Sequence, residues 1–210
     1  AHREPSARVD PEAARRAGVR KVVLASSSAV EEGEARLNGF YAISKLTNER
    51  IAAGYQQAFG LPYVVVRYFN VYGPRQNPKS PYSGVISIFC ERIAAGQPIR
   101  IFGDGQQTRD FVYVADVVAA LLAGMALRPA DSPVFNVCTG VPISIEALAR
   151  LIADLAGKNL DARTEPPCAG EIRHSLGVPT RADAVLTLPD RVPLRTGLSN
   201  VLAWMAGAAN

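Results

Sequence analysis

Residues 41–59 read YAISKLTNERIAAGYQQAF and lie between two apolar runs, VVLASSS at 22–28 and PYVVVRY at 62–68. Within 41–59 apolar residues recur at helical spacing, and Gly60 follows as a stop signal, so this stretch predicts an amphipathic helix. The flanking runs are short and apolar, with many β-branched residues, which is typical of buried parallel strands. Strand, helix and strand in this order predict the centre of an α/β fold.

The alternation of helix and strand continues on both sides of this unit. Residues 11–18 predict the end of a helix, and Ser144 predicts the N-cap of a helix over 145–155. Further elements are expected as helices at 85–95 and 115–127 and as strands at 98–102 and 134–138. Residues 70–83 hold three prolines and a glycine and predict a long, ligand-binding loop. The chain therefore predicts an α/β fold with a parallel sheet.

Composition narrows the classes of protein that fit. The chain has 210 residues, of which 48% are hydrophobic and 20% charged, enough for one or two domains with a core. Its apolar run at 114–127 is interrupted by Asp116 and falls short of the roughly 20 residues of a membrane span. The net charge of +4 is scattered, and three cysteines and two histidines are widely spaced. Residues 1–21 are charged and contain no apolar stretch of the kind that a secretory signal requires. We therefore expect a cytoplasmic protein without membrane, nucleic-acid or metal partners.

Tyr41 and Lys45 lie four residues apart near the start of the predicted helix, so their side chains share one face. A free phenol titrates near pH 10 and is a poor base at neutral pH, but a neighbouring cation favours the phenolate. The serines at 26–28 end the first strand, where open α/β sheets bind ligands. This grouping suits removal of a proton from a substrate alcohol. Taken alone, Y-x-x-x-K is frequent by chance, and an exposed lysine over a half-buried ring is the alternative.

Three longer motifs occur in order: YAISK at 41–45, RYFNVYGPRQNPKSPYSGVI at 67–86 and IFGDGQQTRDFVYVADV at 101–117. With them the chain resembles the extended short-chain dehydrogenase/reductase superfamily, and within it the NAD-dependent UDP-glucose and UDP-N-acetylglucosamine 4-epimerases. The resemblance implies an incomplete Rossmann-like, doubly wound parallel sheet with a smaller C-terminal α/β substrate domain. It divides the chain into a partial NAD-binding domain at 1–70 and 111–137 and a nucleotide-sugar-binding domain at 71–110 and 138–210.

The resemblance also assigns residues. The catalytic group falls on Ser27 (or Ser28), Tyr41 and Lys45. NAD would be contacted by Ser26, Ser28, Tyr41, Lys45 and Phe69. The UDP-sugar would be bound by Asn70, Val85, Phe102, Arg109 and Glu171. The guanidinium fork of Arg109 suits a diphosphate, although a surface ion pair with Asp104 or Asp110 is an equal alternative on position alone.

The activity that the resemblance implies is NAD-dependent 4-epimerisation of a UDP-sugar through a transient 4-keto intermediate. Tyr41 would act as the base for the 4-hydroxyl. Ala29 and Val30 stand where dehydratases of the superfamily carry an acidic pair, which favours an epimerase. The alternatives are a nucleotide-sugar dehydratase or decarboxylase, and a truncated non-catalytic binding protein. The apolar stripe of 41–59 indicates a homodimer, unless it packs on the chain's own sheet.

Two departures from the family pattern bear on these expectations. The chain contains no G-x-x-G-x-x-G, the loop with which this superfamily holds the dinucleotide phosphates, so it is truncated or is part of a longer protein. Cys168 stands where the family usually has an arginine that contacts the nucleotide, and Val178 replaces a usual aspartate. A thiol cannot make the arginine's contact, which would weaken the binding of a UDP group.

Overall fold

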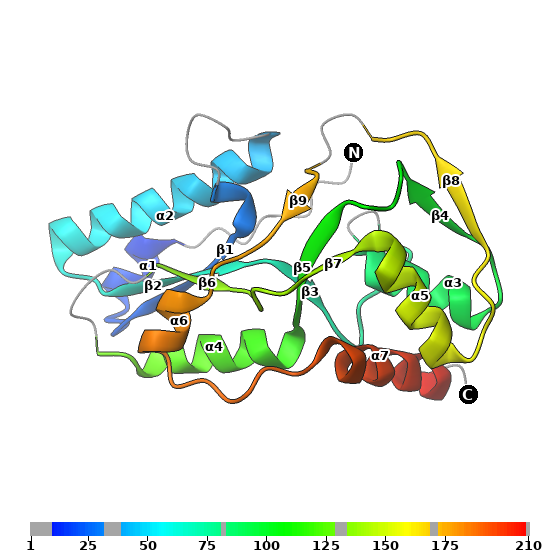
Figure 1. Ribbon diagram of the computed structural model, residues 1–210. Coiled ribbons are helices and arrows are strands. Elements are labelled where there is room, and N and C mark those ends of the chain that lie inside the picture. Colours follow the sequence, from blue (N-terminus) through cyan, green and yellow to red (C-terminus); the bar gives the residue numbers. More distant parts are fainter. Residues whose placement is uncertain (1–9, 32–38, 81–82, 129–133, 169–171, 209–210) are drawn as a thin grey trace.

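The computed structural model of the chain describes residues 10–31, 39–80, 83–128, 134–168 and 172–208. A parallel sheet of three strands has the order β1-β2-β6 and consists of β1 (Val22–Ser27), β2 (Tyr63–Tyr68) and β6 (Val134–Val137) (Figure 1). Ser27 lies beside Tyr68 in the register, so β1 and β2 end at the same edge of the sheet. The parallel strands expected on either side of the long helix are therefore confirmed.

Helices cover both faces of this sheet (Figure 1). The helices of this part of the chain are α1 (Pro11–Arg16), α2 (Gly39–Phe59), α4 (Val114–Ala126) and α6 (Thr180–Val185). Under α2, Val65 packs with Ala52, whereas on the opposite face Val64 and Val66 pack with Val117 of α4. Successive side chains of a strand point to opposite faces, so the central residues 64–66 of β2 need apolar side chains on both faces. This explains its uninterrupted β-branched run.

Strand β1 is less buried than the sequence predicts. Val22 and Val23 are half-buried and Ala25 is exposed, although Leu24 and Ser26 are buried. Among the described residues β1 pairs with β2 alone, which makes it an outer strand of the sheet. Successive side chains of a strand point to opposite faces, so the alternation arises because Leu24 and Ser26 lie under α2, beside Ala52 and Glu49, whereas Ala25 points to the other face.

The rest of the chain builds smaller sheets and a second apolar core. Its strands are β3 (Asn70–Tyr72), β4 (Ile99–Phe102), β5 (Thr108–Tyr113), β7 (Pro142–Ser144), β8 (Ala162–Glu165) and β9 (His174–Ser175). Its helices are α3 (Val85–Ala94), α5 (Ile145–Ala156) and α7 (Leu194–Ala208). Phe89, Ile99 and Leu148 lie in the core between these helices and β4. The division into two domains at the residues given above stays a prediction.

Two local predictions have different outcomes. The Ser144 side chain accepts a hydrogen bond of 3.1 Å from the Ala147 backbone N–H, which confirms it as the N-cap of α5. Residues 70–83 are not wholly loop, because Asn70–Tyr72 forms β3 and pairs in parallel with β5. Its partner, residues 111–113, lies about 40 positions further along the chain, and such a distant pairing leaves no local sequence signal.

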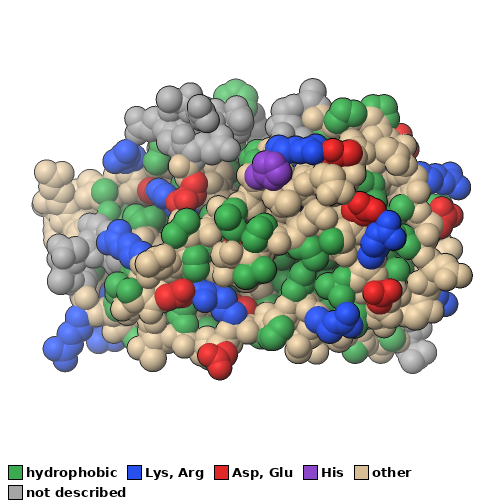
Figure 2. Space-filling view, viewed as in Figure 1, with side chains coloured by type: hydrophobic (Ala, Val, Ile, Leu, Met, Phe, Trp, Pro, Cys, Tyr) green, Lys and Arg blue, Asp and Glu red, His purple; other side chains and the backbone are tan. Residues whose placement is uncertain are grey.

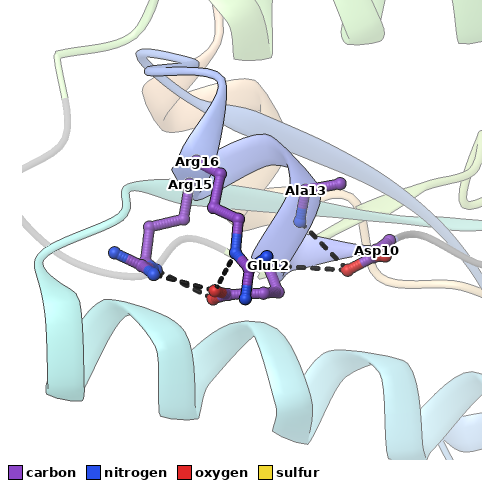
Figure 3. A network of polar contacts seen from close by, with 5 residues as sticks. All are labelled: Asp10, Glu12, Ala13, Arg15 and Arg16. Carbon is purple, nitrogen blue, oxygen red and sulfur yellow. Dashed lines mark hydrogen bonds and ion pairs between the residues drawn. The ribbon is translucent and has the colours of Figure 1, made fainter.

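A network of polar contacts stabilises the short helix α1 (Figure 3). The Asp10 carboxylate caps the helix, and the Glu12 carboxylate binds the guanidinium groups of Arg15 and Arg16 at 2.8 and 2.7 Å. These hydrogen bonds, that from Arg15 first, lower the pKa of Glu12 to about 2. Arg15 also lies 4.9 Å from the ring centre of Phe59 at the end of α2. This network lies exposed on the surface.

The surface shows both signs of charge. Figure 2 shows acidic and basic side chains scattered over one face, in line with the modest net charge of +4. Among the described residues, no helix combines the length and the apolar character that crossing a membrane requires. Within the same residues, no cluster of three or more His, Cys, Asp or Glu side chains is arranged to hold a metal ion.

Candidate functional site

The carboxyl ends of β1 and β2 bring the predicted serines and Phe69 to one edge of the sheet. Ser27 is the last residue of β1, and Ser28 begins a short 3-10 helix, η1 (Ser28–Val30). Phe69 follows β2 directly, and its side chain is buried. In open α/β sheets, ligands bind at the edge where the carboxyl ends of the parallel strands lie.

Helix α2 carries Tyr41 and Lys45 to the same edge. The Lys45 ammonium donates a hydrogen bond of 3.1 Å to the Ala25 carbonyl of β1. It also lies 5.6 Å from the centre of the Tyr41 ring, as their spacing along the helix predicts. Tyr41 is 59% exposed, so its phenol is open to a substrate. The phenol and the ammonium therefore share one local environment beside the end of β1.

The three serines have different surroundings. Ser26 is buried, and its hydroxyl donates to the Glu49 carboxylate beneath α2. The Ser27 hydroxyl accepts a hydrogen bond of 3.2 Å from the Ala29 backbone N–H at the start of η1. Ser28 lines a cleft beyond the sheet edge. The assignment of Ser26 as a cofactor contact stays a prediction, since its hydroxyl is engaged in the interior.

Two adjoining clefts lie beyond this edge. One, of about 450 Å³, is lined among others by Ser28, Phe69, Asn70 and Arg109. The other, of about 830 Å³, is lined among others by Asn70, Val85, Phe102 and Arg109. Asn70 and Arg109 belong to both, so they join the sheet edge to the cleft that reaches Phe102. The fifth residue predicted to bind substrate, Glu171, lies outside the described residues.

Strand β5 holds the residues where the two clefts meet. The Asn70 side-chain amide donates a hydrogen bond of 2.9 Å to the Asp110 carbonyl, and Arg109 Nη1 donates one of 2.8 Å to the Thr108 carbonyl. β5 pairs with β3, β7 and β9, which fixes its backbone from both sides. Arg109 on β5 and Asn70 on the paired strand β3 are thus held at the place where the two clefts meet.

Asp104 and Asp110, the alternative ion-pair partners of Arg109, both have contacts with other groups. Asp104 binds the guanidinium of Arg173 through two hydrogen bonds of 2.6 and 2.9 Å. Asp110 is fully buried, and its carboxylate accepts from the backbone N–H groups of Thr139 at 2.9 Å and Gly140 at 2.8 Å. Asp110 therefore ties the loop after β6 to the strand that carries Arg109.

Sequence reasoning missed the buried carboxylate of Glu49 and the structural role of Asp110. Glu49 lies four residues after Lys45, so helical spacing does place it on the same face. Its burial and its partners depend on how α2 packs against β1 and β2, which no local pattern reveals. Asp110 accepts its hydrogen bonds from residues about 30 positions away, and the sequence offers no sign of that contact.

The cysteines make a first testable prediction. Cys90 and Cys138 are buried, and burial raises the pKa of each thiol to about 12, whereas Cys168 is exposed in a shallow cleft of about 110 Å³ beside Phe102. Since the thiolate is the reactive form, a disulfide reagent at pH 8 should modify one thiol per native chain rapidly. Absorbance of the released thiol reports the count. Cys168→Ser should remove this reaction, and a second rapid thiol in the native chain would contradict the assignment.

Known proteins resemble this chain over most of its length. The model of the NAD dependent epimerase/dehydratase family matches residues 11–138. The UDP-glucose 4-epimerase of Mycolicibacterium smegmatis is 37% identical over 209 residues, covering 92% of this chain and 64% of that protein. The crystal structure of Thermotoga maritima UDP-glucose 4-epimerase with UDP-glucose has a TM-score of 0.87 and 32% identity, covering 95% of this chain and 67% of that one. A Thermus thermophilus UDP-glucose 4-epimerase complex with NAD has a TM-score of 0.79 and 32% identity, covering 94% and 67%.

The chain spans less than the whole of these proteins. Three similar curated relatives are matched over 63 to 65% of their own length. The match nevertheless includes the sheet edge, helix α2 and strand β5, on which the residues described above lie. The family model matches more than half of the chain, and the fold agrees with that of the Thermotoga maritima enzyme at a TM-score of 0.87. The chain belongs to the NAD-dependent epimerase/dehydratase family.

Proposed function

We propose that the protein carrying this chain interconverts the C4 epimers of a UDP-sugar, with NAD as its cofactor. One observation carries the proposal: Asn70 and Arg109 line both clefts. A ligand whose diphosphate lies at these two residues would extend toward Phe102 at one end and toward the sheet edge at the other. A UDP-sugar has this form, with the nucleoside on one side of the diphosphate and the reacting sugar on the other.

The chain's own residues supply the acid–base chemistry of the proposal. The exposed phenol of Tyr41 would take the proton of the 4-hydroxyl, and the Lys45 ammonium lies beside its ring. Ser27 and Ser28, at the end of β1, would hold the same oxygen by a hydrogen bond. The Arg109 guanidinium would hold the diphosphate, which would place the sugar in the cleft lined by Ser28 and Phe69.

The residues at the sheet edge fit the nicotinamide end of NAD. Lys45 can donate to ribose hydroxyls from the carboxyl edge of the sheet, and the buried Phe69 offers an apolar surface beside Ser28. Bound NAD would supply the acceptor and donor of hydride at C4. The chain itself has no G-x-x-G-x-x-G for the dinucleotide phosphates, so this fit covers one end of the cofactor.

The experiment is a product assay on the full-length protein encoded by the gene. UDP-glucose and UDP-N-acetylglucosamine are incubated separately with the protein, and proton NMR follows the anomeric signals. Appearance of the 4-epimer, approached from both directions to one equilibrium ratio, is expected. Carbon dioxide release from a UDP-uronic acid, or a dehydrated sugar product, would instead assign a decarboxylase or a dehydratase. Binding of UDP-sugar with no product, in protein shown to hold NAD, would favour the binding-protein alternative.

Helix α2 also supports a homodimer. It buries Ala42, Glu49 and Ala52 against the rest of the chain, while Ile43 and Ile51 remain 47% and 42% exposed. Apolar side chains on the outward face suit a partner helix from a second copy. Light scattering distinguishes the dimer from the monomer.

We also propose a cytoplasmic location, because the three cysteines are free thiols. Cell fractionation tests this location.

A further inference from the structure

A buried carboxylate lies directly behind the residues proposed for catalysis. Glu49, on α2, is 7% exposed and stands one helical turn beyond Lys45. Its carboxylate accepts a hydrogen bond from the Ser26 hydroxyl of β1. It also binds the Arg67 guanidinium through two oxygens, with Nε–Oε1 at 3.0 Å and Nη2–Oε2 at 2.7 Å. One side chain thus connects α2 to both strands whose ends form the site.

Arg67 extends this connection to the segment that follows η1. It lies near the end of β2, two residues before Phe69. Its Nη1 donates a hydrogen bond of 3.0 Å to Glu31, the residue that follows η1. The guanidinium side chain is 20% exposed, and Glu49 is the main cause that raises the pKa of Arg67 above its ordinary value. The fork of Arg67 therefore joins α2 to the segment that carries Ser27 and Ser28.

Stability alone is a poor explanation for this pair. Removing two charges from water is costly, and replacing a buried ion pair by apolar residues of similar volume is often neutral or stabilising. A paired carboxylate and guanidinium do have one property that apolar residues lack, because their hydrogen bonds are directional. Glu49 and Arg67 make such bonds to three site-bearing elements, β1, α2 and the loop after η1.

We propose that Glu49 and Arg67 are positioning residues, which set Tyr41 and Lys45 on α2 against Ser27 and Ser28. This inference rests on the proposed epimerase function, because it assigns a task within that reaction. The phenol of Tyr41 is exposed in the first turns of α2, and the ion pair lies about two turns further along. A displacement of about 1 Å in a reacting group can cost on the order of 100-fold in rate, so anchoring of α2 controls turnover.

The test separates positioning from stability with two variants in the full-length protein. Glu49→Gln keeps the shape of the side chain but removes its charge. The double variant Glu49→Leu/Arg67→Met replaces the whole pair by apolar side chains. Glu12→Gln is the matched control, since Glu12 also binds arginine but lies exposed on α1, which carries none of the proposed site residues. For each variant, kcat, KM, the melting temperature and a crystal structure are determined.

In Glu49→Gln, kcat should fall about 10- to 100-fold with KM little changed, and the melting temperature should fall as well. In the double variant the melting temperature should return to that of the unaltered protein, while kcat stays low and the first turns of α2 are displaced from β1. Glu12→Gln should keep its kcat. A double variant that recovers both stability and kcat would show a purely structural pair.

The outcome for the pair can be distinguished from the outcome for the function. If the unaltered protein forms no epimer, the proposed function fails, and the crystal structures alone then decide the positioning. An unchanged distance between Lys45 Nζ and the Ala25 carbonyl in the double variant would overturn it. If the unaltered protein is active and the double variant equals it in kcat, positioning fails and the function stands.

Discussion

Turnover of a UDP-sugar should fall by about 10²- to 10⁴-fold when Tyr41 is replaced by Phe. The substitution removes the hydroxyl that is proposed to accept the substrate proton and leaves the ring beside Lys45 in place. Binding of the nucleotide should change little, because Arg109 and Phe102 lie in the cleft that is proposed to hold it. The measurement is kcat by proton NMR, with UDP affinity determined by calorimetry on the same preparation.

The matched control for Tyr41→Phe is Tyr55→Phe on the same helix. Tyr55 lies near the far end of α2, with its ring centre 5.4 Å from that of Phe59. Loss of its hydroxyl should leave kcat unchanged. If Tyr41→Phe retained full turnover, the base would have to be another residue, and the chemistry assigned to α2 would be wrong.

Replacing Gly177 by Ala should destabilise the protein by about 1–3 kcal/mol, the usual cost of overpacking a filled interior. A Cβ at this position would lie 2.4 Å from both Cβ and Sγ of Cys138 and 2.9 Å from Cε1 of Phe69. Neither contact can be relieved without moving a buried side chain. Thermal unfolding should show a melting temperature lower by about 2–4 °C for each kcal/mol. Because Phe69 lies at the sheet edge, turnover should fall too.

Gly54→Ala is the control for Gly177→Ala. Gly54 is an exposed glycine within α2, and a Cβ there would meet no heavy atom within 4 Å. Alanine is favoured over glycine inside a helix by roughly 0.5–1 kcal/mol, so this variant should be slightly more stable than the unaltered protein. An unchanged melting temperature in Gly177→Ala would show that the loop containing Gly177 can shift without cost.

The parts of the fold that sequence reasoning predicts are those with a local cause. The helix over 41–59 repeats its apolar positions at helical spacing, and the run at 62–68 needs an apolar side chain for each face of the sheet. Ser144 caps α5 through its own hydroxyl, so residues 144–147 contain the whole interaction. In each case the residues that make the contact are close in sequence or share one periodic pattern.

The parts that escape prediction depend on contacts between distant segments. Residues 70–72 form a strand because they pair with β5. The prolines that follow them in sequence indicate a loop and give no sign of this pairing. The Glu49–Arg67 pair and the crowding at Gly177 likewise exist only once the elements pack. The site itself is an intermediate case. Tyr41 and Lys45 follow from helical spacing, whereas the grouping of Asn70, Val85, Phe102 and Arg109 came from family resemblance.

The alternation of side chains on β5 has a consequence for how this protein can be re-engineered. Arg109 lines the clefts, and its neighbour Asp110 points the opposite way into a fully buried set of backbone hydrogen bonds. Arg109 therefore stands on a strand whose other face is fixed by buried contacts, whereas Ile172 and Leu176 line the sheet-edge cleft from outside the strands. A library built to change the sugar accepted in the proposed reaction should randomise Ile172 and Leu176 and leave β5 untouched.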